Sequence, residues 1–318
     1  MSNIILALNT SNLISPTLYY IICAVLALVI LLGIYLMSKV KTSVFGNGLS
    51  AFALLLGIIV TFVRYNVLPM PLIYVALAIG TILGLILAYK VKMIEMPQMV
   101  ALLNGLGGGA SLLVGIFAAF GIGANLDAFS KSTSLLAISV GVITLLGSLI
   151  AAGKLHKIFT QKPIVFKGHQ IYTTISLILA VGMIIIGSIP NLIDPTIAVV
   201  GTMLLSSIFG IMFTIRVGGA DMPITISLLN SFSGVAGAIA GLAISDTLLV
   251  AVGGIVGSSG LLLTQIMCKA MNRSLMDILL GKTTVIGKKE DSKVEVKQKV
   301  TKEKESSHLE LLKSAKNV

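Results

Sequence analysis

The sequence predicts an all-α membrane protein, a polytopic bundle of about nine transmembrane helices. Hydrophobic residues make up 56% of the 318 residues and charged residues only 11%, whereas soluble domains carry roughly 25% charged residues. The apolar residues also fall in blocks of about 18 or more with almost no charge, enough to cross ~30 Å of hydrocarbon. Because lipid offers no hydrogen bonds to an open backbone, these blocks must be helices.

Nine apolar blocks are separated by clusters of turn-forming residues. The predicted spans lie near 18–38, 49–67, 70–90, 96–120, 132–153, 170–189, 195–215, 222–243 and 246–268. The separating clusters include 45–48 (FGNG), 68–71 (LPMP), 190–195 and 218–221 (GGAD). Since similar blocks follow the first one along the whole chain, we do not interpret the first as a cleaved signal peptide.

Loop charge predicts the orientation of the bundle. Loops on one side carry only Arg64 and Lys131, and loops on the other side carry nine basic residues. The nine are Lys39, Lys41, Lys90, Lys92, Lys154, Lys157, Lys162, Lys167 and Arg216. The positive-inside rule assigns the basic side to the cytosol. With an odd number of spans, the N-terminus is then outside and the C-terminus is cytosolic.

The net charge of +11 does not indicate a nucleic-acid partner, because of where the charge lies. Ten of the 23 basic residues fall in 282–318, where they alternate with six acids, and most others lie in loops on one side. We predict a short N-terminal segment at 1–17, a transmembrane domain at 18–280 and a charged cytosolic tail at 281–318. Within the tail, 308–316 (HLELLKSAK) is suited to a short amphipathic helix.

Two segments of the chain form an internal repeat. Residues 96–115 (MPQMVALLNGLGGGASLLVG) resemble 222–241 (MPITISLLNSFSGVAGAIAG) at an offset of 126. Each copy begins with Met-Pro, carries Leu-Leu-Asn and follows an acid, Glu95 or Asp221, which a helix N-terminus stabilises. Four crossings separate the copies, so we predict a parallel repeat about an axis along the membrane normal, an arrangement found in transport proteins.

Each copy of the repeat presents one small, polar helix face. The two faces contain Pro97, Ala101, Asn104, Gly108, Ser111 and Gly115, and Pro223, Ser227, Asn230, Gly234, Gly237 and Gly241. Close packing explains most of the glycines. The amides of Asn104 and Asn230 lie about 10–12 Å from the helix end, where an amide needs either a neighbouring helix or water in a cavity. Both alternatives stay open, and we expect the two amides to face one shared axis.

Residue patterns that signal catalysis are absent from this sequence. Residues 105–110 (GLGGGA) are similar to phosphate-binding loops, but they follow no strand and lie inside a predicted membrane helix. Cys23 and Cys268 lie within apolar helices, so we predict neither a disulfide nor a metal site. The three histidines, His156, His169 and His308, fall in a predicted loop and the tail, and we expect them to be solvated.

A resemblance to a known family is carried by 218–274, which contains GGADMP, LLNSFSG, VGSSG and IMCKAMNRS. This stretch closely resembles the membrane domain of the β subunit of proton-translocating nicotinamide nucleotide transhydrogenase, and EMPQMVALLNGLGGGAS in the first repeat fits the same family. The resemblance covers roughly residues 18 to 280. It implies that inward proton movement through the membrane domain drives hydride transfer from NADH to NADP+ between two cytosolic domains.

The same resemblance implies cofactors, partners and a location. It implies a bacterial inner-membrane subunit that works with α subunits in lipid, as a dimer of the complex. The NADP-binding domain of the family follows the membrane helices, but this sequence ends at Val318. We therefore expect that domain to be missing or encoded elsewhere, so that NAD and NADP serve the complex while this chain binds neither and does not transfer hydride alone.

Roles are carried over from the family residue by residue. Many members have a proton-relaying histidine where this chain has Asn104, so the resemblance implies that α-subunit helices supply a titrating group. It places Asn230, Ser258 and Ser259 along the proton path. It places four residues at the cytosolic mouth, Glu95, Asp221, Asn272 and Arg273. Each has a structural alternative, such as a helix cap for Asp221, a packing bond for Asn230 and an interfacial anchor for Arg273.

Two other classes of function are alternatives to a transhydrogenase membrane subunit. A secondary transporter would bind a small solute between the parallel repeats, without partners. A purely structural membrane scaffold is the third class, and the paired buried asparagines disfavour it because buried amides are costly in a helix that only packs.

Overall fold

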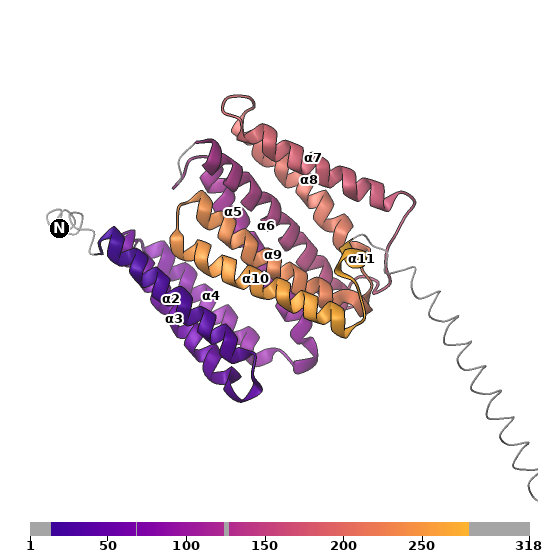
Figure 1. Ribbon diagram of the computed structural model, residues 1–318. Coiled ribbons are helices and arrows are strands. Elements are labelled where there is room, and N and C mark those ends of the chain that lie inside the picture. Colours follow the sequence, from indigo (N-terminus) through magenta and orange to yellow (C-terminus); the bar gives the residue numbers. More distant parts are fainter. Residues whose placement is uncertain (1–13, 68, 124–126, 280–318) are drawn as a thin grey trace, which may run out of the picture.

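The computed structural model describes residues 14–67, 69–123 and 127–279, in which every regular element is a helix (Figure 1). Nine of these described helices are long and apolar enough to cross a membrane. They are α2 (Pro16–Met37), α3 (Ser43–Arg64), α4 (Pro71–Lys90), α5 (Met96–Ala119), α6 (Ala128–Leu155), α7 (His169–Ser188), α8 (Pro195–Ile215), α9 (Met222–Ala243) and α10 (Thr247–Ala270). Three short 3-10 turns and the five-residue helix α11 (Leu275–Leu279) complete the described chain. The predicted charged tail, including His308, lies outside the described residues.

Local sequence sets where the helices begin. Proline occupies the first turn of α2, α4, α5, α8 and α9, where a missing N–H leaves no helical bond unmade. Aspartates cap three starts, those of α6, α8 and α10: Asp127 accepts from the Ser130 N–H, Asp194 from the Thr196 N–H and Asp246 from the Leu249 N–H. These caps let each apolar block begin its helix at the membrane boundary.

The centre of the bundle is formed by α5, α6, α9 and α10, with α2–α4 on one side and α7 and α8 on the other (Figure 1). Glycines let the central backbones approach closely. A Cβ atom at Gly108 would lie 2.8 Å from the Gly141 carbonyl oxygen of α6, and one at Gly234 would lie 2.7 Å from the Gly257 Cα of α10. The central helices therefore pack in two pairs, α5 with α6 and α9 with α10.

The two ends of the bundle differ in their loops. At one end, which we call the Asp221 end, α5 and α9 begin and α6, α8 and α10 end. The loop 156–168 bonds there to α5, to the end of α8 and to the segment before α9. At the other, the Asp246 end, α9 turns into α10 near the start of α2 and the end of α3. Each end brings together segments far apart in sequence.

One predicted boundary is wrong. We expected 45–48 (FGNG) to form a turn before a helix at 49, but these residues lie inside α3, which begins at Ser43. Gly46 packs against α2 instead: a Cβ there would lie 2.6 Å from the Gly33 carbonyl oxygen. The glycines thus serve close helix packing, a role that turn statistics do not distinguish from a loop.

The neighbouring glycines Gly253 and Gly254 of α10 provide a test of this packing. A Cβ at Gly253 would lie 2.8 Å from the Gly234 oxygen and 2.9 Å from the Ala238 Cα, whereas one at Gly254 meets nothing within 4 Å. We expect Gly253→Ala to destabilise the protein by about 1–3 kcal/mol through overpacking. Gly254→Ala, its matched control, should leave stability unchanged. Thermal unfolding in detergent, followed by circular dichroism, measures the difference; equal midpoints would contradict the packing.

Candidate functional site

A line of polar and small side chains joins α5 to α9 in the centre of the bundle. Asn104 of α5 is only 7% exposed, and its Nδ2 donates to the Ile226 carbonyl oxygen of α9 at 3.3 Å. Asn230 lies one turn beyond Ile226 on α9. The sequence leaves two partners open for the Asn104 amide, a neighbouring helix or water. In this structure the amide bonds to a neighbouring helix. Such interhelical bonds contribute roughly 0.6–2 kcal/mol in membranes.

The contact continues along both helices at intervals of about one turn. A Cβ at Gly107 would lie 2.6 Å from the Ser233 hydroxyl of α9, and one at Gly237 would lie 4.0 Å from the Ser111 hydroxyl of α5. We call Asn104, Ser111, Asn230, Ser233 and Gly237 the polar seam. It is built from the faces that the repeat predicts to be small and polar, together with Ser233.

Asn230 lies at the edge of the seam next to α10. It is half-buried, and its Nδ2 lies 3.1 Å from the position that a Cβ at Gly260 would take. On the adjoining face of α9, Ser231 donates to the Gly257 oxygen at 2.6 Å, and the Thr264 hydroxyl donates to the Ser227 hydroxyl at 3.0 Å. These bonds hold α10 against the side of the seam.

The two predicted serines of α10 take different positions. Ser259 is half-buried and donates to the Val256 oxygen of its own helix at 2.9 Å. Ser258 is exposed on the same open face as Gly254 and donates back to the Gly254 oxygen. The described chain therefore does not bring Ser258 to the seam.

At the Asp221 end, two predicted mouth residues form an ion pair. Arg273, just after α10, places its Nε 3.2 Å from the Oδ1 of Asp221, which precedes α9 and is buried. The Asp221 carbonyl also accepts from the Thr225 hydroxyl at 3.4 Å. The pair fixes the segment that follows α10 to the start of α9. A hollow of about 460 Å³, lined by 161–163 and 218–221, opens beside it.

The other two predicted mouth residues lie nearby in the fold but have separate contacts. Glu95 is half-buried before α5, and its Oε2 accepts from the Lys92 N–H at 3.4 Å. It lines a second hollow of about 370 Å³ with residues of α5 and 155–157. Asn272 is exposed and has a positive φ of 52°, the left-handed conformation that ends α10. The two hollows thus adjoin the starts of the two repeat helices.

Two of the nine basic residues that we expected in loops are buried. They are Lys154 and Arg216. The Lys154 ammonium is fully buried and donates to the carbonyl oxygens of Ile215, Val217 (2.8 Å) and Lys162 (3.5 Å). Arg216 donates to the Gln170 side chain at 2.6 Å, and burial lowers its pKa. Lys154 therefore joins the loop 156–168 to the connection before Asp221. Sequence spacing gives no signal for this, since the acceptors lie up to 63 residues away.

The expectation of solvated histidines is wrong for His169. It is 3% exposed, its Nε2 lies 2.8 Å from the Met212 oxygen, and its ring contacts Phe166. Because a carbonyl can only accept, Nε2 carries the proton. His156 is exposed, as predicted. His169 therefore fastens α7 to α8 at the Asp221 end.

The described residues define what the seam is able to do chemically. They contain no group of three or more metal-ligating side chains, and Cys23 and Cys268 are free and buried. The seam side chains are amides and hydroxyls, which donate and accept hydrogen bonds without titrating near neutral pH. Such a seam is suited to orienting water or closing against it.

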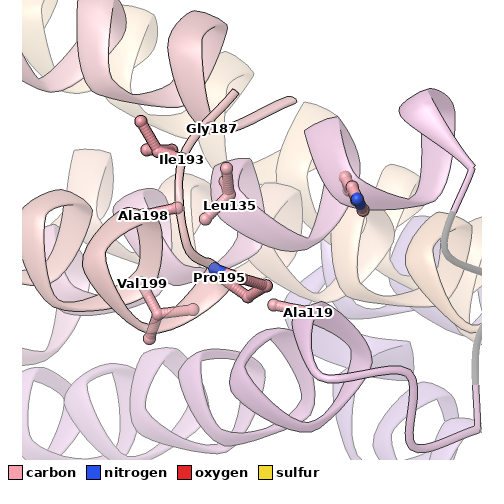
Figure 2. A pocket seen from close by; sticks show the side chains of 8 residues that line it. Ala119, Leu135, Gly187, Ile193, Pro195, Ala198 and Val199 are labelled. Carbon is pink, nitrogen blue, oxygen red and sulfur yellow. The ribbon is translucent and has the colours of Figure 1, made fainter. Parts of the chain in front are cut away.

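A small pocket at the Asp246 end lies among α5, α6, α7 and α8 (Figure 2). Leu135, Ile193 and Ala198 are among its lining residues, and its volume is about 20 Å³. That volume holds about one water molecule. This pocket therefore has no room for a solute larger than water.

Known proteins of similar sequence identify the family of this chain. A family model described as "NAD(P) transhydrogenase beta subunit" matches residues 18–318. Two curated relatives from Rhodospirillum rubrum, one of them from a named strain, are called "NAD(P) transhydrogenase subunit beta". Each is 36% identical over 269 residues, which cover 82% of this chain and 57% of the relative. The chain thus spans little more than half the length of these relatives. With a family model covering nearly the whole sequence, the chain belongs to the NAD(P) transhydrogenase beta subunit family.

Proposed function

We propose that this chain is the proton-conducting, coupling subunit of a transhydrogenase complex. In the complex, inward proton movement through the membrane would drive hydride transfer from NADH to NADP+. The observation that carries the proposal is the polar seam in the centre of a multi-pass membrane protein of this family. Buried amides in a membrane are costly unless they serve packing or a pathway.

In the proposed complex, partner subunits would complete the proton path. The α subunit would provide the titrating group that Asn104 cannot, and its helices, together with lipid, would surround the bundle. NAD and NADP would serve the complex, with its NADP-binding domain next to the mouth residues Glu95, Asp221, Asn272 and Arg273. We further propose a dimer of the complex in the bacterial inner membrane, without nucleic-acid partners.

The seam would conduct through both copies of a parallel repeat. Gly108 packs on α6 and the equivalent Gly234 packs on α10, which supports a repeated α5–α6 and α9–α10 arrangement. Asn104, Asn230 and Ser259 would line the path, and the Asn104–Ile226 bond would have to open for water to pass. Ser258 would join the path only where an α-subunit helix covers the open face of α10.

Asn230→Leu tests the seam as a proton path. Leucine keeps the apolar character needed for insertion but removes the amide, so proton-coupled turnover in the reconstituted complex should fall at least about tenfold. Proton uptake into liposomes is the measurement. Ser207→Ala, which removes a half-buried hydroxyl bonded within α8, is the control and should stay within about twofold of wild type. Unchanged uptake in Asn230→Leu would refute the assignment.

Asp221→Asn tests the mouth. Asparagine has nearly the same shape as aspartate but carries no charge, so it cannot form the ion pair with Arg273. We expect an assembled complex whose hydride transfer no longer responds to the proton gradient. Asp194→Asn, an exposed cap at the opposite end, should behave as wild type. A variant that fails to assemble would show that the Asp221–Arg273 pair is structural only.

Cysteine labelling tests the proposed orientation, in which the Asp221 end is cytosolic. In a background with Cys23 and Cys268 replaced by alanine, Lys41→Cys and Ser245→Cys place single thiols at opposite ends of the bundle. A membrane-impermeant maleimide added outside intact cells should label only the thiol of Ser245→Cys. The reverse pattern would invert the topology.

A further inference from the structure

A buried carboxyl group at the Asp246 end has no role in the function proposed above. The described residues contain six acids, and only Asp221 and Asp246 are buried. The two stand at opposite ends of α9, which has 22 residues and is therefore ~33 Å long. Asp221 has Arg273 as its ion partner. Asp246 has a different environment.

Three separate segments meet at Asp246. Its Oδ1 accepts from the Leu249 N–H at 2.8 Å, and its Oδ2 accepts from the Tyr19 hydroxyl of α2 at 3.4 Å. Tyr19 is 2% exposed and Asp246 is 8% exposed. The Tyr65 ring, just after α3, stands edge-on to the Tyr19 ring with centroids 6.0 Å apart. Two neutral donors, the Leu249 N–H and the Tyr19 hydroxyl, thus bond to a buried carboxyl group at a membrane boundary.

The titratable and charged groups around Asp246 come from α2 and from the end of α3 with the residue that follows it. They are Tyr19, Tyr20 and Cys23 of α2, Arg64 of α3, and Tyr65. The Arg64 guanidinium lies 5.9 Å from the Tyr65 ring centroid. Burial, and secondly the Asp246 carboxylate, raises the pKa of Tyr65, so that this phenol stays neutral. Within this cluster, the Asp246 carboxyl oxygens are the atoms that accept hydrogen bonds, from the Tyr19 hydroxyl and the Leu249 N–H.

Helix capping does not explain why Asp246 is buried. Asp127 and Asp194 cap α6 and α8 at the same end of the bundle, and both are exposed. A cap needs only an oxygen at the first free N–H groups. Burying a carboxylate costs free energy. Ionisable residues within membrane spans are markers of ion pathways, and Asp246 lies directly before the span of α10.

Asp246 lies just beyond the end of the α9 face that contributes to the polar seam. The Asp246 N–H donates to the Gly241 oxygen at 2.8 Å. Gly241 lies on the same face of α9 as Asn230 and Gly237. The turn that carries Asp246 therefore follows directly from the end of that face.

We propose that Asp246, held by Tyr19, is the outer proton-accepting group of the path whose inner end is the Asp221–Arg273 pair. The inference rests on the proposed function and its orientation. A hydronium ion from outside water transfers its proton to an Asp246 carboxylate oxygen, forming one O–H bond and releasing water. The acid then returns that proton to water in the seam and becomes an anion again, with Tyr19 holding the carboxyl group in place throughout.

The test uses the full chain assembled with its partner subunits in liposomes. Asp246→Asn keeps the cap and a partner for Tyr19 but cannot take up a proton, and Asp246→Glu restores the carboxyl group. Proton uptake is measured across a range of outer pH, and NADP binding by the complex is measured alongside. Asp127→Asn removes an exposed carboxylate cap from the same end and is the matched control.

We expect Asp246→Asn to slow proton uptake about tenfold or more and to flatten its dependence on outer pH. Asp246→Glu should restore uptake and its pH dependence, while Asp127→Asn and NADP binding stay within about twofold of wild type. Wild-type uptake and pH dependence in Asp246→Asn would overturn this inference alone. Loss of assembly in both Asp246 variants would assign the residue a structural role and would also overturn it. A wild-type complex that does not move protons would instead refute the proposed function.

Discussion

The close approach of helix backbones at glycine is the constraint on which the rest of the structure depends. Gly108 and Gly141 bring α5 against α6, and Gly234 and Gly257 bring α9 against α10. Lipid provides no hydrophobic drive between apolar helices, so this close contact supplies the packing energy. With the two pairs formed, the faces left between α5 and α9 carry amides and hydroxyls. The Asn104 bond to Ile226 is a consequence of that arrangement.

Polar side chains at the two ends of the bundle tie distant segments together in different ways. At the Asp221 end, Lys154 and the Asp221–Arg273 pair connect loop 156–168, the start of α9 and the segment after α10. At the Asp246 end, Tyr19 and Asp246 connect α2 to α10. One end is held by cations on carbonyls and a carboxylate, and the other by a carboxyl group among phenols.

Sequence patterns predict the spans well because crossing hydrocarbon demands long uncharged blocks, and the nine predicted blocks correspond to nine described helices. Sequence patterns fail where one residue type is common in two different structural settings. Gly46 suits a turn but packs on Gly33, and Lys154 suits a cytosolic loop but is buried among carbonyls. For the site, the repeat predicts the faces of Asn104 and Asn230, and the resemblance places Asp221 and Arg273 at one mouth. The Tyr19–Asp246 contact joins residues 227 apart, and no local pattern predicts such a meeting.

The central claim is that water reaches the seam between α5 and α9 as the complex works. Thiol accessibility at position 233 tests it most directly, in a chain that lacks Cys23 and Cys268 and is assembled with its partners in the membrane. A small charged thiol reagent in water should modify the thiol of Ser233→Cys, on the α9 side of the seam, during turnover. It should not modify the thiol of Leu83→Cys on the apolar surface of α4. Equal resistance at both positions during turnover would show a dry seam and contradict proton conduction through it.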